Sequence, residues 1–305
     1  MRMTYRKIGR LTACIAAAVM LATVCGCTGT TANPAERAAS DGANTSQDGA
    51  SQPEPTEPSD EFGTVTQGTD TYRGFVMDNV LHSPDDGDIH FHIHVPDSYD
   101  GSEPVALFLT LPGYQGLYFQ GVGENLYTED FAFQAEQYDD RMIIAAPQLS
   151  DWGETSSRQA IALTEYLLNA YTIDASRVFA EGYSGGGETM SRVMGMRPDL
   201  FSAYLHCSSQ WDGDIATLAE SETPVYLVVG QDDEYYGSEP SETAYDRIRD
   251  QYKDRGLSER RINELVTLDV KDAAYFANQG ITNQHGGGGT LFSHDPDIMG
   301  WLFNR

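Results

Sequence analysis

The 305-residue sequence contains few basic residues. It has 19 Lys and Arg against 46 Asp and Glu, a formal net charge of −27 at pH 7. A nucleic-acid-binding surface needs clustered Lys and Arg to contact phosphates, and this chain would repel a polyanion, so nucleic acid is excluded as a partner. Hydrophobic residues still make up 40% of the chain. That content is enough to bury a sizeable core, so a fully disordered chain is excluded as well.

The sequence also lacks a hydrophobic run long enough to span a membrane comfortably. The apolar run Leu11–Gly26 is 16 residues long, short of the ~20 that a spanning helix needs. It follows four basic residues and no acid: Arg2, Arg6, Lys7 and Arg10. A basic start before a short apolar run predicts a secretion signal over residues 1–26. Without it, the remaining chain has 15 Lys and Arg against 46 acids, a net charge of −31.

The end of this run resembles the lipobox of bacterial lipoproteins. In Val24-Cys25-Gly26-Cys27, an aliphatic residue and a small residue precede the cysteine that would be lipidated. The resemblance implies a lipid anchor on Cys27 at the extracellular face of the bacterial cell membrane. An uncleaved anchor and an ordinary signal are the alternatives. All three place the rest of the chain outside the cytoplasm.

Cysteine is scarce: the sequence has four, at positions 14, 25, 27 and 207. Only Cys207 lies in the region expected to fold, so no internal disulfide can form there. Its apolar neighbours predict a small buried side chain. That region therefore has no cysteine pair to bind zinc.

Residues 28–65 have hardly any large apolar side chain, and seven acids oppose Arg37 alone. Such a segment cannot bury enough surface to offset its ordering entropy. We therefore expect a signal over 1–26, lipidated Cys27 and a disordered tether over 27–67, and one folded domain over 68–305. No internal repeat is evident.

The expected domain alternates between strand-like and helix-like segments. Val105–Leu111 is a continuous apolar run, typical of a strand buried on both faces. Further strands are predicted at 71–77, 88–95, 142–147, 177–181, 203–207, 224–229 and 265–270. Helices are predicted at 158–171, 188–196, 243–252 and 296–303. This alternation indicates a mostly parallel sheet covered by helices on both faces, with ligands at the carboxyl ends of the strands.

One post-strand loop carries the motif G-x-S-x-G at residues 182–186. With a strand before it and a helix after it, the motif predicts a nucleophile elbow with Ser184 as the nucleophile. A simple Gly and Ser turn is the alternative. The amide of Gly185 is the expected first oxyanion donor. The loop after Val105–Leu111 supplies the second, and we assign it to the N–H of Tyr114.

A serine nucleophile needs a base and an acid that orients the base. The acid is expected after the strand at 224–229, where Asp232, Asp233 and Glu234 are all candidates. Spacing does not separate them, and two of the three are expected to be solvated turn residues. His285 and His294 are the candidates for the base. His294 adjoins a predicted helix start, so we favour His285, which we place in the long loop after the last strand.

The stretch IDASRVFAEGYSGGGETM resembles the elbow region of secreted α/β-hydrolase esterases, a group that includes polyhydroxybutyrate depolymerase-like, feruloyl-esterase-like and prolyl-oligopeptidase-like enzymes. The likeness covers most of residues 70–305, including VPDSYDG, APQ and a G-x-x-D. It implies the α/β-hydrolase fold and a Ser-His-Asp triad. The position of G-x-x-D implies Asp233 as the acid, and the distance to Trp301-Leu302 matches His285.

The sequence departs from this group at two places. Pro112-Gly113 stands where the group often has His-Gly, and no Trp-Pro follows His285. A polymer substrate is therefore not implied. The aromatic residues expected to contact substrate are Tyr118, Trp152, Tyr183 and Trp211. The segments 208–223 and 234–260 are short, so little or no lid domain is expected.

Three alternating histidines, His90, His92 and His94, fall on one face of a predicted strand. A His-x-His pair can bind a metal. No carboxylate or cysteine at ligand spacing accompanies them, so we expect a polar strand face and no metal.

These features predict a monomeric extracytoplasmic serine hydrolase that cleaves carboxylic esters through Ser184, His285 and Asp233 without a cofactor. Its partner would be a small or oligomeric ester, and its only membrane contact the lipid anchor. A serine peptidase on the same fold and a non-catalytic lipid-anchored binding protein are the alternatives.

Overall fold

The computed structural model describes residues 60–114, 123–151 and 153–305. The predicted signal, Cys27 and most of the predicted tether lie outside these residues. Within the described ranges, no helix is both long enough and apolar enough to cross a membrane.

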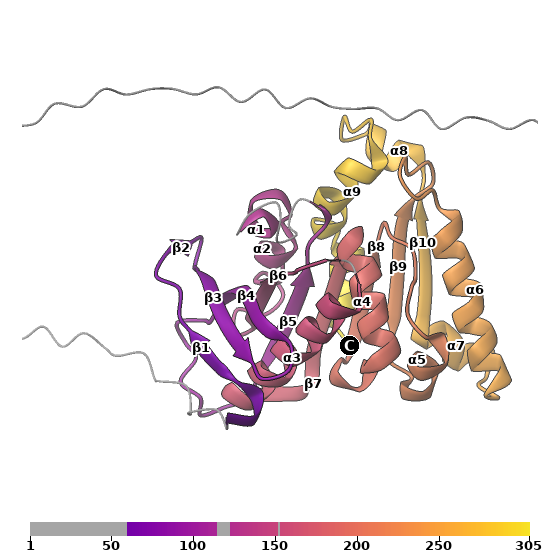
Figure 1. Ribbon diagram of the computed structural model, residues 1–305. Helices are drawn as coiled ribbons and strands as arrows, with labels where there is room; N and C mark the ends of the chain where they lie inside the picture. Colours follow the sequence, from indigo (N-terminus) through magenta and orange to yellow (C-terminus); the bar gives the residue numbers. More distant parts are fainter. Residues whose placement is uncertain (1–59, 115–122, 152) are drawn as a thin grey trace, which may run out of the picture. The chain divides into compact units, whose positions relative to one another are not determined.

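A single ten-stranded sheet forms the centre of the described part (Figure 1), in the order β1-β3-β4-β6-β5-β7-β8-β9-β10, with β2 paired to β3. The strands are β1 (Thr64–Thr66), β2 (Thr71–Tyr72), β3 (Phe75–Ser83), β4 (Gly87–His94), β5 (Val105–Leu111), β6 (Ile143–Gln148), β7 (Ile173–Tyr183), β8 (Ala203–Cys207), β9 (Val225–Gly230) and β10 (Val266–Lys271).

The sheet is parallel from β6 to β10 and antiparallel at its amino-terminal side. Strands β6, β5, β7, β8, β9 and β10 pair in parallel, whereas β1, β3 and β4 pair antiparallel and join the rest through β4 and β6. The prediction of a mostly parallel sheet is confirmed. The sheet already includes Thr64, which pairs with His82, so it begins within the segment predicted as tether.

Helices connect the strands and cover the sheet. They are α1 (Glu124–Thr128), α2 (Phe131–Ala135), α3 (Glu154–Ala170), α4 (Gly185–Met196), α5 (Ile215–Ser221), α6 (Glu239–Asp254), α7 (Glu259–Leu265), α8 (Ala273–Ala277), α9 (Gln284–Ser293) and α10 (Pro296–Phe303), with short 3₁₀ turns η1 (Asp60–Phe62) and η4 (Pro198–Leu200).

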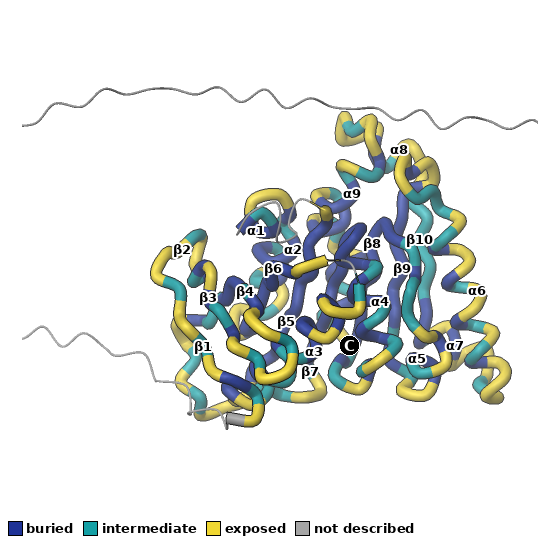
Figure 2. Tube along the Cα trace, viewed as in Figure 1, coloured by how far each residue is buried: buried dark blue, intermediate teal, exposed yellow. Residues whose placement is uncertain are grey.

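Two hydrophobic cores form because side chains alternate along each strand. From β5, Leu107 and Leu109 pack in a core with residues of α3, α4, α5, α6 and α7. Ala106 and Phe108 face a second core with α1, α2, α9 and α10. Every residue of β5 is buried, and Figure 2 shows the central strands as the buried layer between more exposed helices. The prediction of helices on both faces is thereby confirmed.

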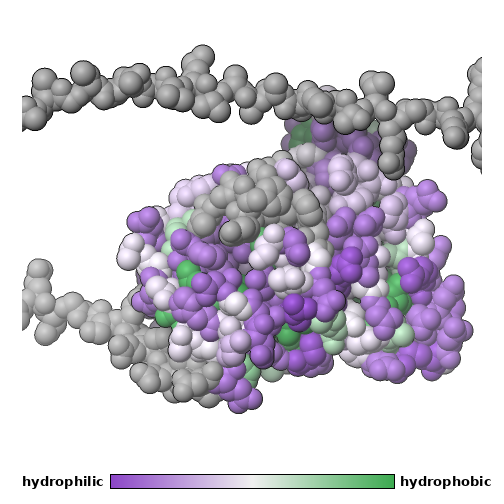
Figure 3. Space-filling model, in the orientation of Figure 1, coloured by the Kyte–Doolittle hydropathy of each residue, from purple (hydrophilic) through white to green (hydrophobic). Residues whose placement is uncertain are grey.

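The segments after β8 and β9 pack against the sheet. Leu218 of α5, Ile248 of α6 and Ile262 of α7 are fully buried in the first core, so these helices form part of the domain rather than a lid. The face shown in Figure 3 is mostly hydrophilic, with scattered hydrophobic residues.

Candidate active site

The motif at residues 182–186 forms a sharp turn between β7 and α4. Ser184 is the one residue between them and has φ 52° and ψ −119°. A non-glycine residue at positive φ is strained and persists only where its surroundings hold it. Here the Ser184 N–H donates to the carbonyl of Cys207 at 2.9 Å, and the Ser209 hydroxyl donates to the Ser184 carbonyl at 2.6 Å. The turn therefore projects the Ser184 side chain at the carboxyl edge of the sheet.

The loop after β5 packs directly on this turn. A Cβ on Gly186 would lie 2.4 Å from the carbonyl oxygens of Leu111 and Pro112. Only glycine allows this approach, which brings the predicted oxyanion loop to the start of α4. Tyr114, the predicted second donor, lies in this loop, and the residue is 49% exposed.

The structure brings Ser184, His285 and Asp233 together. Ser184 Oγ lies 3.0 Å from His285 Nε2, and His285 Nδ1 lies 2.8 Å from Asp233 Oδ2. These three residues come from the elbow, the start of α9 and the loop after β9. A serine, an imidazole and a carboxylate in this order can move a proton from the hydroxyl to the imidazole.

Asp233 is held as an ionised acceptor. Its side chain is fully buried, and its Oδ1 accepts the N–H groups of Tyr235 at 3.0 Å and Tyr236 at 2.8 Å. Burial acts to raise its pKa, but the hydrogen bonds from His285 and the two amides outweigh burial, so the pKa lies below the ordinary value. Ionised Asp233 can therefore orient His285.

The other candidate acids have different positions. Asp232 is exposed, and its N–H donates to Gln284 at 2.8 Å. Glu234 accepts the backbone N–H of His285 at 3.0 Å. Neither carboxylate reaches the His285 ring nitrogen that Asp233 contacts.

The expectation that His285 lies in a long loop is wrong, because His285 lies in the first turn of α9. Asn283 caps this helix by accepting from the N–H of Gly286. The run of glycines has low intrinsic helix propensity, yet it permits close packing, since a Cβ on Gly288 would lie only 3.3 Å from Ser208 Oγ, after β8. Tertiary packing therefore makes this segment helical.

His294 lies at the other end of the same helix. It is the C-cap of α9, with Nδ1 2.8 Å from the carbonyl of Thr290 and Nε2 3.1 Å from Gln134. Asp295, rather than His294, caps α10. The helix thus separates the two histidine candidates, and His285 is the one beside Ser184.

Aromatic rings pack around His285. The Tyr183 ring stacks on it with centroids 5.8 Å apart, and the Tyr183 hydroxyl donates to the His285 carbonyl. Tyr235 also stacks on the imidazole, at 5.3 Å. Because Tyr183 is only 8% exposed, it supports His285 from the interior, and a contact with substrate stays a prediction.

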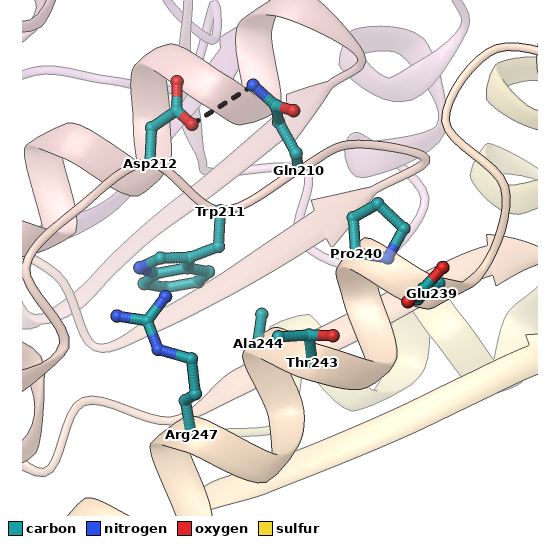
Figure 4. Close-up of a pocket in the computed structure, with 8 residues that line it drawn as sticks. All are labelled: Gln210, Trp211, Asp212, Glu239, Pro240, Thr243, Ala244 and Arg247. Carbon is teal, nitrogen blue, oxygen red and sulfur yellow. Dashed lines mark hydrogen bonds between the residues drawn. The ribbon is translucent and has the colours of Figure 1, made fainter. Parts of the chain in front are cut away.

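Trp211, another predicted substrate contact, lines a pocket of about 300 Å³ between the segment after β8 and the start of α6 (Figure 4). Arg247 and Glu239 of α6 also line it, and none of Ser184, Asp233 and His285 does. Predicted contacts Tyr118 and Trp152 lie outside the described residues.

Sequence reasoning missed the pair formed by Glu188 and Tyr236. The Tyr236 hydroxyl donates to Glu188 Oε1 at 2.6 Å, and Glu188 lies in the first turn of α4, directly after Ser184. Burial raises the pKa of Glu188 against the opposing bond from Tyr236. The available signal was the spacing of four residues from Ser184, which puts Glu188 on the same helical face.

Two of the three histidines of β4 contact the same residue, Asp78, and the third contacts Gly74. His90 pairs with Asp78 at 2.6 Å, His92 accepts the N–H of Asp78 at 3.0 Å, and His94 lies 3.2 Å from the carbonyl of Gly74. Burial lowers the pKa of His92 to about 4, so its ring is neutral. Within the described part of the chain, no group of three or more potential metal ligands occurs.

Comparison with known sequences points to hydrolases. Residues 148–253 match the model of the prolyl oligopeptidase family. Feruloyl esterase B from Thermothelomyces thermophilus is 30% identical over 143 residues, 45% of this chain. The match spans 49% of the length of that relative.

Solved structures share the fold at low identity. A thermostable esterase superposes with a TM-score of 0.61 and 19% identity, over 76% of this chain and 63% of that chain. The glucuronoyl esterase from Solibacter usitatus superposes with a TM-score of 0.51 and 10% identity, over 73% of this chain and 84% of that chain. The chain has the α/β-hydrolase fold, and the sequence matches together with this fold support a serine hydrolase.

Proposed function

We propose that this chain is an extracytoplasmic serine hydrolase that cleaves carboxylic esters, with Ser184 as nucleophile, His285 as general base and Asp233 as the residue that orients His285. The observation that carries the proposal is the continuous set of contacts from Ser184 Oγ to His285 at 3.0 Å and from His285 to Asp233 at 2.8 Å. The strained backbone of Ser184 supports it, because strain clusters at functional sites.

In the proposed reaction, Ser184 Oγ attacks the ester carbonyl carbon while its proton passes to His285 Nε2. The carbonyl electron pair moves to oxygen, and the amides of Gly185 and Tyr114 stabilise that charge. The intermediate collapses, and the alcohol leaves with the proton from His285. Water then attacks the carbonyl carbon of the acyl-enzyme while its proton passes to His285. The second intermediate collapses, releases the acid and returns the proton to Ser184. This scheme uses no cofactor.

The esterase relative supports ester substrates, whereas the prolyl oligopeptidase family match favours a second candidate, a serine peptidase. The two differ in the leaving group, an alcohol or an amine. Assays with a p-nitrophenyl ester and with a p-nitroanilide of the same acyl group distinguish them. Cleavage of the anilide without cleavage of the ester would favour the peptidase.

The decisive experiment uses Ser184→Ala. We expect wild-type chain to hydrolyse p-nitrophenyl acetate and to be labelled covalently by a fluorophosphonate, and Ser184→Ala to do neither. Normal activity in the variant would refute the assignment. Failure of the wild-type chain to react would support a non-catalytic binding protein. A panel of acetyl, butyryl, feruloyl and oligomeric esters then defines the acyl group.

The proposed location is the extracellular face of the bacterial membrane, with the monomeric domain held by a lipid on Cys27. The support is the lipobox-like sequence Val24-Cys25-Gly26-Cys27 after a basic, apolar segment. Cys27→Ser is expected to move the chain out of the membrane fraction and to abolish incorporation of labelled fatty acid. Unchanged fractionation would refute the anchor.

A further inference from the structure

Two buried polar side chains reach the loop after β5 from α1 and the residue that follows it. Asn125 Nδ2 donates to the carbonyl of Thr110 at 3.2 Å, and Glu129 Oε1 accepts the N–H of Gly113 at 2.7 Å. Asn125 is 1% exposed and Glu129 8% exposed. They are four residues apart, so they lie on one side of the turn. Together they contact both ends of the segment 110–113.

The same segment is held from other sides. The Thr110 hydroxyl donates to Glu181 Oε2 of β7 at 2.8 Å. The carbonyls of Leu111 and Pro112 lie against Gly186. A Cβ on Gly113 would lie 2.8 Å from Glu129 Oε1. The backbone before Tyr114 therefore has little room to move.

We propose that Glu129 is a positioning residue that fixes the loop carrying the Tyr114 amide, and so helps to orient the second oxyanion donor. This inference rests on the proposed function. Oxyanion donors act because they are already oriented when charge develops, so a small displacement is costly. Without Glu129, the Gly113 N–H would be a buried donor without an acceptor, and the loop would shift to satisfy it.

The charge state of Glu129 suits this position. Burial raises its pKa to about 8, against the lowering effect of the Gly113 hydrogen bond. The titratable groups that interact with it are Glu181 and Tyr183 of β7 and Cys207 of β8. Below that pH, neutral Glu129 accepts from Gly113 without adding a negative charge to the loop that carries the Tyr114 amide. Glutamine, which has the same acceptor and no charge, is therefore expected to replace it.

The test compares Glu129→Met with Glu129→Gln in the full chain. Glu124→Met is the matched control, because Glu124 lies in the first turn of the same helix and has no role in the proposed site. We expect Glu129→Met to lower kcat for p-nitrophenyl acetate by about tenfold to 100-fold, with KM nearly unchanged. The decrease should be no larger than the decrease in kcat caused by removing one oxyanion donor. Glu129→Gln and Glu124→Met are expected to keep kcat within about threefold of wild type.

A second readout is independent of catalysis. Deuterium exchange of the peptide bearing Gly113 is expected to speed up in Glu129→Met and to stay at the wild-type rate in Glu129→Gln. An unchanged exchange rate in Glu129→Met would show that Glu129 does not hold the Gly113 N–H, whatever the value of kcat. Faster exchange with normal kcat would overturn its catalytic role, as would an equal loss of kcat in Glu129→Gln. Failure of the proposed function shows instead as activity retained in Ser184→Ala.

Discussion

The hydroxyl of Tyr236 donates a 2.6 Å hydrogen bond to Glu188, which lies in the first turn of α4, directly after Ser184. The backbone N–H of the same tyrosine donates to Asp233 at 2.8 Å. One loop residue thus contacts the proposed acid through its backbone and the helix that follows the proposed nucleophile through its side chain. Its position ties the loop after β9 to the start of α4.

Removing this hydroxyl is expected to impair the site. In Tyr236→Phe, the partly buried Glu188 loses its donor, so the first turn of α4, directly after Ser184, is held less firmly. A change of about 1.4 kcal/mol in the barrier is tenfold in rate, and we expect kcat/KM for p-nitrophenyl acetate to fall by about that factor.

Tyr245→Phe is the matched control for this substitution. It also removes one hydroxyl, but that hydroxyl accepts from Arg249 on α6. We expect kcat/KM to stay at the wild-type value. Equal losses in the two variants would show that the Tyr236 hydroxyl has no special effect at Ser184.

The two candidates for the base, His285 and His294, are expected to differ strongly in how much their substitution lowers activity. His285→Ala removes the imidazole 3.0 Å from Ser184 Oγ, and we expect kcat to fall by about four orders of magnitude or more, as for other triad bases. His294→Ala changes the far end of α9, where we expect activity within about threefold of wild type. Hydrolysis of p-nitrophenyl acetate measures both, and similar losses would contradict the assignment of the base.

Local patterns in the sequence predicted those features whose cause is local. The apolar run Val105–Leu111 predicted β5 with the bounds that the structure has, because every residue of a central parallel strand is buried. The elbow at Ser184 was predictable because a tight turn between strand and helix needs glycines at fixed spacing.

The remaining features depend on contacts between distant segments. Asp232 and Asp233 are neighbours in sequence, and only the fold decides which carboxylate faces His285. The four glycines after His285 disfavour a helix locally, yet the segment is helical, capped by Asn283 and packed through Phe292 in the second core. Glu129 and Gly113 are 16 residues apart, and no local pattern predicts that they meet.

Stability is expected to depend on pH through Glu129. Its pKa is about 8 in the folded chain against an ordinary value of 4.5. Between these values the folded chain keeps a proton that the unfolded chain loses, so this group's contribution to the free energy of unfolding falls as pH rises. One proton changes that free energy by at most about 1.4 kcal/mol per pH unit. Glu129→Gln removes this titration while keeping the acceptor for Gly113.

Chemical denaturation of wild type and Glu129→Gln at several pH values between about 5 and 8 tests this dependence. We expect the free energy of unfolding to decline less steeply with pH in the variant. Some slope should remain, because burial also raises the pKa of Glu181 well above its ordinary value. Glu124→Gln, on the same helix, is the control and should follow wild type. Parallel curves for wild type and Glu129→Gln would mean that Glu129 titrates alike in the folded and unfolded chain, which its burial argues against.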